Sequence, residues 1–548
     1  METGYGWLAG PTIYTIMARG GGSMKAWTEE RLVLEEFARN LEATPSLPNA
    51  SEGELELHAV HVARVTDLLI QVADSPRNKR PPVRKWDEVL GPLLFQLFAK
   101  GDDIDRYVLG DLWRGVLLDE GEIDGFLRAT TSLAASARDF YRFEEALEAC
   151  RQGRQAAKGQ ASAAYANLIN LEGIIHAFRE DYEASEHSFR EAASMAEGLA
   201  EEDFPKWTRA TKADYGNRLR LNLMECYLRQ GLSAAGEERV KHGRRAREYL
   251  SQLEGEPLRD THRSFLLVNA AMLAIVEERL DFAKSLLLPL TRRGPGGASE
   301  DLSFLAVHSR LLSVIAALEG HWEDAYHWIR KAIREGIRYR RIGEEQDILE
   351  QALNVLRGLK GHRKSASHGA LVQDLIQLLE DKDWYTGRSH SHGVSRLSVR
   401  LGEVLNAMPN HHLDLKLLEV GGLLHDIGKL KTPWSLLNKL APLGPREWDI
   451  LKEHPLHSAH ILQRIGMEEV APIVKGHHEH MDGTGYPEGR PPDLLAAIVG
   501  AADAFEAATT PTRRYKIPKD RRVLLQELSE GAGLRYHPDV VEGLKKIA

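Results

Sequence analysis

The sequence predicts an all-α protein, in which an N-terminal α-solenoid of helical repeats precedes a second all-helical domain. Residues 27–359 show successive amphipathic patterns rich in Leu, Ala, Glu and Arg, which favour helices. Strand-like alternations of Val, Ile or Thr are few, and one pattern of small and bulky residues recurs. Because 548 residues exceed what a single hydrophobic core usually organises, we expect at least two domains.

The first 23 residues are predicted to be a disordered tail or to precede the true start of the chain. They have some apolar character but lack the basic start and the long apolar centre of a secretion signal. Met24 is the alternative initiator.

Composition and charge argue against several classes of protein. The chain is 43% hydrophobic and 28% charged, as in ordinary globular proteins. Its net charge of -9 argues against broad binding to DNA or to anionic membranes, since both reward a positive surface. It has no uncharged apolar run of about 18 residues, the length of a membrane helix. Cys150 and Cys226 are far apart, so we expect a reducing, cytoplasmic location.

A recurring layout predicts pairs of helices within residues 24–360. A small residue is followed, about nine positions later, by an aromatic residue or Leu, and then by small, bulky and small residues. The clearest copies are Gly173, Tyr182, Ser185, Phe189, Ala192 and Ser313, Trp322, Ala325, Ile329, Ala332. Weaker copies begin at Ala134 and Ala271. Small residues let antiparallel helices approach closely. The layout resembles degenerate tetratricopeptide repeats.

Stacked helix pairs of this kind have a concave surface, which commonly binds a peptide or another protein. We therefore predict a sensory or partner-docking role for residues 24–360, with a spacer or a homodimerisation scaffold as the alternative. Residues 361–369, GHRKSASHG, are small and polar, as is typical of a linker. The second domain is predicted to span residues 370–548.

Histidines and aspartates accumulate in this second domain. His425 and Asp426 stand together at the end of an apolar helix, LEVGGLLHDIGKL, where a carboxylate is costly unless it is paired or binds a cation. The candidate ligands are His390, His425, Asp426, His454, His477, His478 and Asp503. Imidazole and carboxylate suit iron, manganese or zinc, and one carboxylate can bridge two ions. The set predicts a two-metal hydrolase.

Five motifs in residues 381–547 resemble the HD-GYP family, a branch of the HD phosphohydrolases associated with cyclic di-GMP breakdown in bacteria. They are YTGRSH, LLHDIGKL, KEHPLHSAHIL, HHEHMDGTGYP and ADAFEAATTPTRRYK, in family order. The resemblance implies an all-helical signalling phosphodiesterase that hydrolyses cyclic di-GMP to pGpG or GMP. The alternatives are a noncatalytic module, which binds a cyclic dinucleotide or acts as a scaffold, and a hydrolase of another phosphate ester.

The resemblance also implies a ligand set for each of two divalent metal ions, iron or manganese, with zinc as a further choice. One ion would be surrounded by His390, His425, Asp426 and Asp503. The other would be surrounded by Asp426, His454, His477 and His478. Asp426 would be the bridge, and a hydroxide shared by the ions would attack phosphorus in line with the departing 3' oxygen.

The same resemblance implies residues that contact the substrate. Lys429 would contact a nonbridging phosphate oxygen, so Asp426 and Lys429 are the candidate catalytic residues. Two glycines and a proline in DGTGYP predict a rigid turn close to the site, with Tyr486 lining the cavity. Arg513 and Lys516 match the basic positions of the family's RPYK-like segment.

Several positions depart from the family pattern. Thr386 stands where some members have a glutamate for a third metal, so we expect two ions. Gly393 replaces an arginine and Glu506 an aspartate. Glu479 and Asp482 are expected to orient ligands by hydrogen bonding. Four further histidines of the domain are expected not to bind metal: His411, His412, His457 and His460.

Overall fold

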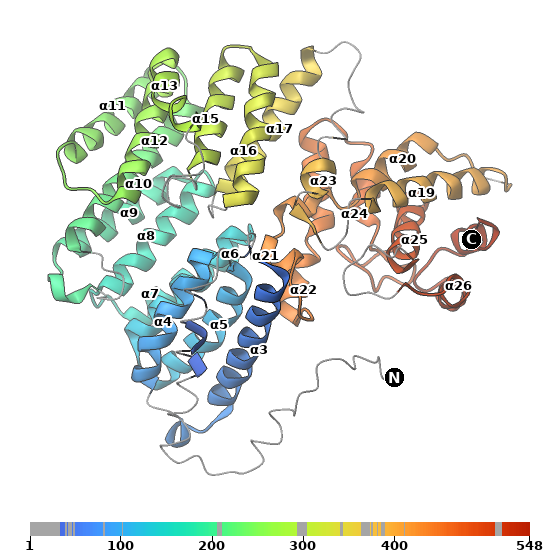
Figure 1. Cartoon of the computed structure of the whole chain (residues 1–548), viewed down its shortest axis with the longest axis horizontal. Helices are drawn as coiled ribbons and strands as arrows, with labels where there is room; N and C mark the ends of the chain where they lie inside the picture. The colour runs from blue at the N-terminus through green and yellow to red at the C-terminus, as the bar shows by residue number, and fades with distance from the viewer. Residues whose placement is uncertain are drawn as a thin grey trace.

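The computed structural model is all-helical over the residues that it describes, which confirms the predicted fold class (Figure 1). It describes residues 50–547 except 81–82, 101, 205–210, 293–303, 340–343, 363–372, 374–375, 381, 385–388, 410 and 510–517, and only short stretches between 33 and 47. The predicted tail with Met24, the position of Thr386, and both Arg513 and Lys516 lie outside the described residues.

The N-terminal helices follow one another in antiparallel succession and form an arc (Figure 1). Their bounds are α3 Glu52–Asp74, α4 Val83–Lys100, α5 Asp103–Glu120, α6 Ile123–Asp139, α7 Phe143–Ala157, α8 Ala163–Phe178, α9 Tyr182–Glu197, α10 Lys212–Ser233, α11 Gly236–Leu253, α12 Asp260–Val276, α13 Leu280–Leu287, α15 Leu305–Leu318, α16 Trp322–Tyr339 and α17 Glu344–His362. Short 3-10 turns join some of them: η2 Arg77–Lys79, η3 Glu201–Asp203 and η5 Leu290–Arg292.

Each copy of the predicted layout coincides with one helix pair. Gly173 lies in α8 and Tyr182 begins α9. A Cβ atom at Gly173 would lie 2.7 Å from the Phe189 ring, so the absence of a side chain there is what admits this ring between the helices. Ser185 and Ala192 are also buried. The seam between these helices is the one that the layout predicts, while kinship with tetratricopeptide repeats stays a prediction.

The C-terminal helices are shorter and more varied in direction. Their bounds are α19 His390–Asn406, α20 Leu415–Leu424, η6 Ile427–Lys431, α21 Trp434–Leu437, α22 Pro445–Leu451, α23 His454–Arg464, α24 Ala471–Gly476, α25 Leu494–Thr509, α26 Arg521–Glu530 and α27 Pro538–Ile547. Leu401 and Leu405 of α19 are buried in one core with residues of α25 and α27. Since α17 ends at His362, the first two residues of the predicted linker are helical, and residues 363–369 lie outside the described part of the chain.

The C-terminal region packs against both ends of the N-terminal arc (Figure 1). Leu436 and Ile450 are buried in the same core as residues of α3 to α8. At the other end, Leu353 of α17 is buried in one core with Leu424 and Leu462. The two predicted domains therefore share buried surface.

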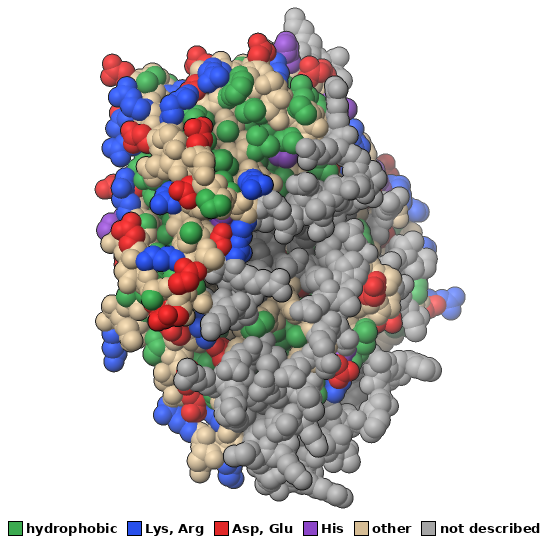
Figure 2. All heavy atoms as spheres, turned by 60° about the vertical axis from the view of Figure 1, so that its left-hand side comes forward, with side chains coloured by type: hydrophobic (Ala, Val, Ile, Leu, Met, Phe, Trp, Pro, Cys, Tyr) green, Lys and Arg blue, Asp and Glu red, His purple; other side chains and the backbone are tan. Residues whose placement is uncertain are grey.

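The charged side chains and the two cysteines can be placed in the structure. Acidic and basic side chains are interspersed over the described residues on the face that Figure 2 shows. Cys150 and Cys226 are buried free thiols. Among the helices that the structure describes, none combines the length and apolarity that a membrane crossing needs.

A buried histidine between α3 and α5 makes the stability of the N-terminal helices depend on pH. His58 Nε2 lies 2.6 Å from Asp102 Oδ2 and 3.6 Å from Asp105 Oδ2. Burial opposes the charged ring, but hydrogen bonds to the two carboxylates raise the pKa of His58 to about 10. Because the pKa in the folded state exceeds the unfolded value of about 6.5, the charged ring stabilises the fold fully below about pH 6.5, and this stabilisation is lost as pH rises towards 10.

We therefore expect the free energy of unfolding of the wild type, relative to His58→Gln, to decline between about pH 7 and pH 10. Urea unfolding at each pH measures this difference. His61→Gln is the matched control, since His61 lies one turn further along α3 and burial lowers its pKa. A difference between wild type and His58→Gln that stays constant over this range would contradict the prediction.

Candidate metal centre

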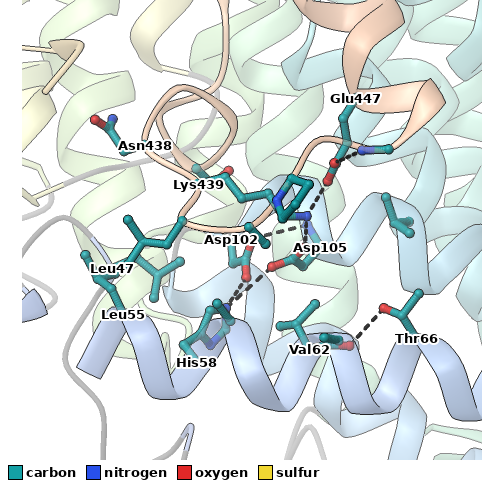
Figure 3. A pocket seen from close by; sticks show the side chains of 18 of the residues that line it. Leu47, Leu55, His58, Val62, Thr66, Asp102, Asp105, Asn438, Lys439 and Glu447 are labelled. Carbon is teal, nitrogen blue, oxygen red and sulfur yellow. Dashed lines mark hydrogen bonds and ion pairs between the residues drawn. The ribbon is translucent and has the colours of Figure 1, made fainter. Parts of the chain in front are cut away.

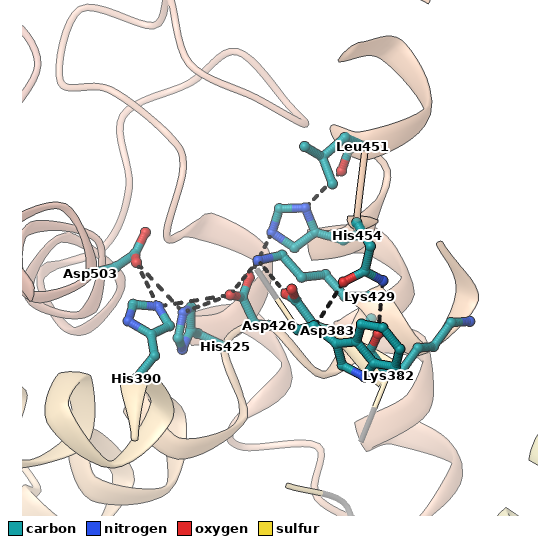
Figure 4. Close-up of polar contacts among 12 residues, drawn as sticks. Lys382, Asp383, His390, His425, Asp426, Lys429, Leu451, His454 and Asp503 are labelled. Atoms are coloured by element: carbon teal, nitrogen blue, oxygen red, sulfur yellow. Dashed lines mark hydrogen bonds and ion pairs between the residues drawn. The ribbon is translucent and has the colours of Figure 1, made fainter. Parts of the chain in front are cut away.

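Seven predicted ligands converge from five segments of the C-terminal region. His390 and His454 are the first residues of α19 and α23, and Asp503 lies within α25. His425 and His477 follow the last turns of α20 and α24. Asp426 and His478 come directly after them. Figure 4 shows His390, His425, Asp426, His454 and Asp503 turned towards one another.

Three of the histidines are oriented by the backbone of their own segment. The Nδ1 atom lies 2.9 Å from Gly422 O in His425, 2.7 Å from Leu451 O in His454 and 2.6 Å from Val474 O in His477. An imidazole that donates its Nδ1–H to a carbonyl presents Nε2 as the lone-pair donor. This fixed orientation suits a metal ligand.

The two carboxylate oxygens of Asp426 face different histidines. Oδ1 lies 3.2 Å from His454 Nε2. Oδ2 lies 3.2 Å from His425 Nε2 and 3.9 Å from His390 Nε2. A carboxylate with imidazoles on either side has the arrangement that bridging two ions requires.

The distances group the ligands in nearly the predicted way. Asp426, His454, His477 and His478 have ligand atoms within 4.8 Å of one another, which is the second predicted set. His390, His425 and Asp426 form another group. Asp503 groups with His425 and His477, and its Oδ1 lies 3.1 Å from His390 Nε2. Asp503 is thus near both sets instead of one.

The protonation states in the site are those that bind metal ions. Although burial acts in the opposite direction, interactions with His425 and Lys429 hold the pKa of Asp426 well below its ordinary value. Burial, with His425 and His454 nearby, lowers the pKa of His477 to about 3. Metal ligands must be ionised carboxylates and neutral imidazoles. His425 Nε2 is also buried and makes no hydrogen bond. Since buried polar atoms normally have a partner, this nitrogen is suited to bind a cation. The residues fit a metal centre.

A glycine holds two ligand-bearing segments together. A Cβ atom at Gly428 would lie 2.0 Å from His454 O. The Gly428 N–H donates to Ser458 Oγ over 2.8 Å, and the Ser458 hydroxyl donates to His425 O over 2.9 Å. Any larger residue at 428 would push η6 away from α23 and so separate Asp426 from His454.

Lys429 lies beside the ligands, as predicted, with a neighbour that the sequence did not reveal. Its Nζ is 2.7 Å from Asp426 Oδ2 and 3.5 Å from Asp383 Oδ2 (Figure 4). Asp383 is buried. Its position seven residues before the first ligand gave no distinct pattern, because the contact with Lys429 is made across the fold.

Two departures from the family pattern are complementary in space. Glu506 accepts a hydrogen bond from His390 Nδ1, so it orients this ligand. A Cβ atom at Gly393 would lie 2.8 Å from Glu506 Oε1. The missing side chain at 393 therefore provides the space that the longer acid occupies. Sequence reasoning treated the two positions separately and missed this function of Glu506.

We expect Glu506→Ala to weaken metal binding by about 10- to 100-fold, the range typical of residues that orient a ligand. Calorimetric titration of the chelator-treated protein with Mn²⁺ measures the change. Glu403→Ala removes an exposed acid from the same helix as His390 and should bind Mn²⁺ like the wild type. Equal affinities for all three proteins would show that Glu506 does not support His390.

The loop of residues 482–487 lies against a predicted ligand. The Tyr486 N–H donates to His478 O over 3.2 Å, and the two rings have centroids 4.8 Å apart. Glu479 and Asp482 do not orient ligands, contrary to expectation. The Glu479 carboxylate accepts from the backbone N–H groups of residues 488–490, and Asp482 accepts from Thr484. Asp482 thus stabilises the loop, and Glu479 stabilises the residues that follow it.

The other histidines of this region stay outside the site. The candidate metal groups among the described residues do not include His411, His412, His457 or His460. His457 instead lies near the Tyr141 ring of the N-terminal helices, with centroids 6.1 Å apart.

Comparisons with known proteins agree with the motifs. Residues 373–540 match the family model described as HD domain, which confirms this part of the resemblance. A cyclic di-GMP phosphodiesterase of Thermotoga maritima is 34% identical over 183 residues, which are 32% of this chain and 48% of the relative. A 3'3'-cGAMP-specific phosphodiesterase of Vibrio cholerae is 37% identical over 139 residues, 25% of this chain and 31% of the relative. The chain thus spans about half or less of the length of these curated relatives.

Proposed function

We propose that this chain is an HD-GYP-type, metal-dependent phosphodiesterase that hydrolyses cyclic di-GMP. The observation that carries the proposal is the position of Asp426, whose two oxygens lie 3.2 Å from imidazoles of different ligand sets. The match to the HD domain and the names of the relatives support the reaction class. The choice of substrate rests on these names and on the DGTGYP loop.

The residues of the site divide the work of hydrolysis. Two divalent ions, iron or manganese by ligand type and zinc as the third choice, would supply a hydroxide at neutral pH and neutralise phosphate charge. Asp426 would bridge them, with His390, His425 and Asp503 on one side and His454, His477 and His478 on the other. Lys429 offers its ammonium group to a nonbridging phosphate oxygen.

Substrate orientation falls to residues at the edge of the site. Tyr486 is held against His478, where its ring can contact a base or ribose of the substrate. Arg513 and Lys516 are proposed to bind phosphate or guanine, in line with the family's basic segment. The buried free thiols of Cys150 and Cys226 support action in a reducing cytoplasm.

A second substrate is favoured by a specific observation. One of the relatives is named for 3'3'-cGAMP and is 37% identical over the region it shares with this chain. This nucleotide has the same 3'–5' phosphodiester bonds, so the same centre could cleave it.

The concave face of the N-terminal helices is proposed to dock a peptide or protein that regulates the enzyme.

Purified protein of measured metal content, incubated with cyclic di-GMP, 3'3'-cGAMP and cyclic di-AMP, tests the proposal. Chromatography of the products shows whether pGpG or GMP accumulates. We expect conversion of cyclic di-GMP by the wild type and none by Asp426→Ala. Binding of these nucleotides without turnover by the metal-loaded wild type would instead identify a noncatalytic module.

A further inference from the structure

The part of the chain between two predicted metal ligands packs among the N-terminal helices. We call residues 432–453, which join η6 to α23, the linking segment. It contains α21 and α22, which lie beside α3 and α5 in Figure 1. Leu436 and Ile450 are buried in the N-terminal core. The segment begins six residues after Asp426 and ends just before His454, so its position bears on both ligands.

A cavity of about 420 Å³ separates part of the linking segment from the N-terminal helices (Figure 3). Its apolar walls include Leu55 and Val62 of α3 and Trp434 and Leu440 of the segment. Leu55 and Trp434 lie in one small buried cluster, against which Leu440 packs. The segment therefore has apolar contacts with α3 beside this cavity.

Buried ionic contacts also join the linking segment to the N-terminal helices. Lys439 Nζ lies 3.1 Å from Asp105 Oδ1 of α5 and also binds Glu447. The three side chains are 16%, 9% and 4% exposed. Asp105 and Asp102 in turn contact His58 of α3. Buried ion pairs of this kind can fix the register between elements, and the loss of one partner leaves a charge buried without compensation.

The residue next to Lys439 continues the connection towards the metal centre. The Asn438 side chain donates to Lys382 O over 3.0 Å and accepts from the Trp384 N–H over 2.9 Å. These two backbone groups flank Asp383. The Asp383 carboxylate lies 3.5 Å from Lys429 Nζ, which lies 2.7 Å from Asp426 Oδ2 (Figure 4).

The far end of the linking segment is also held by the N-terminal helices. Arg142 Nε lies 3.2 Å from Glu453 Oε1, and Glu453 directly precedes His454. Tyr141, which precedes Arg142 in the chain, contacts Lys431, whose Nζ lies 4.7 Å from the centroid of the Tyr141 ring. Lys431, the residue just before the segment, and Glu453, its last residue, thus both contact the loop between α6 and α7.

We propose that Lys439 is a positioning residue for the metal centre, which ties the N-terminal helices to Lys429 and Asp426 through Asn438 and Asp383. The inference rests on the proposed metal centre and not on the identity of the substrate. The N-terminal helices are thus connected to the site by a continuous series of contacts between neighbouring residues.

Calorimetric titration of the full-length chain with Mn²⁺ tests the proposal without any substrate. We expect Lys439→Met to weaken binding by about 10-fold, at the low end of the range for residues that support metal ligands. Arg154→Gln is the matched control, because both carboxylate partners of Arg154, Glu172 and Glu191, belong to the N-terminal helices. Equal affinities for Lys439→Met and the wild type would overturn the proposal.

A charge exchange at the far end of the segment covers the case in which Lys439→Met does not fold. Arg142→Glu should weaken Mn²⁺ binding, and the double variant Arg142→Glu/Glu453→Arg should restore it. Failure of both changes to alter affinity would overturn the route through the linking segment. Absence of Mn²⁺ binding by the wild type would overturn the metal centre itself, so the two failures are distinguishable.

Discussion

Asp426→Ala is expected to lose both metal ions and to lower kcat by more than about 1000-fold, since removal of even one charge-stabilising group costs about 10²- to 10³-fold. Each oxygen of Asp426 faces a different set of imidazoles, so one substitution deprives both ion positions of a ligand. Each position then has one ligand fewer and less negative charge to offset a divalent ion.

Elemental analysis of the purified variant measures the metal lost, and cyclic di-GMP turnover measures the activity. Asp449→Ala, which removes an exposed acid on α22, is the control and should keep both. Full metal occupancy in Asp426→Ala would show that Asp426 is not the bridge.

Lys429→Met is expected to lower kcat/KM by about 10²- to 10³-fold while metal content stays unchanged. The ammonium group lies 2.7 Å from Asp426 Oδ2, within reach of a phosphate that would bind to the ions held by this carboxylate. It adds fixed positive charge where negative charge develops during attack on phosphorus. Methionine keeps the length of the side chain but removes this charge.

Steady-state kinetics with metal analysis on the same preparation separate the two quantities. Lys416→Met changes an exposed lysine on α20 and should leave both unchanged. If metal content fell together with activity in Lys429→Met, Lys429 would act by holding Asp426 and not by contacting the substrate.

The ligand residues could be predicted because each lies in a short sequence motif that indicates its chemistry. An HD pair at the end of an apolar helix, and a histidine doublet before a glycine-rich turn, are recognisable without a structure. Their orientation follows from the same local feature, since His425 and His477 lie at helix C-termini, where backbone carbonyls are available to Nδ1. The place of Asp503 near both ligand sets could not be predicted, because it depends on how α25 packs.

The supporting residues could not be predicted, because they act across the fold. Glu506 reaches His390 from a position 116 residues away, and Lys439 reaches Asp105 from 334 residues away. Periodicity and motif spacing describe each helix but not its neighbours. For the same reason, the sequence predicted two domains separated by a linker at residues 361–369, whereas residues on both sides of it share hydrophobic cores. The functions of Arg513 and Lys516 stay predictions from the family pattern.

The claim that Asp426 bridges two ions is tested most directly by measuring the rate of hydrolysis as a function of the number of ions bound. Protein freed of metal with a chelator is titrated with Mn²⁺, and the initial rate of cyclic di-GMP hydrolysis is followed at each step together with the metal bound per chain. We expect no activity without metal and a rate that reaches its maximum only when about two ions are bound. Full activity in the metal-free protein, or a maximum at one ion per chain, would contradict it.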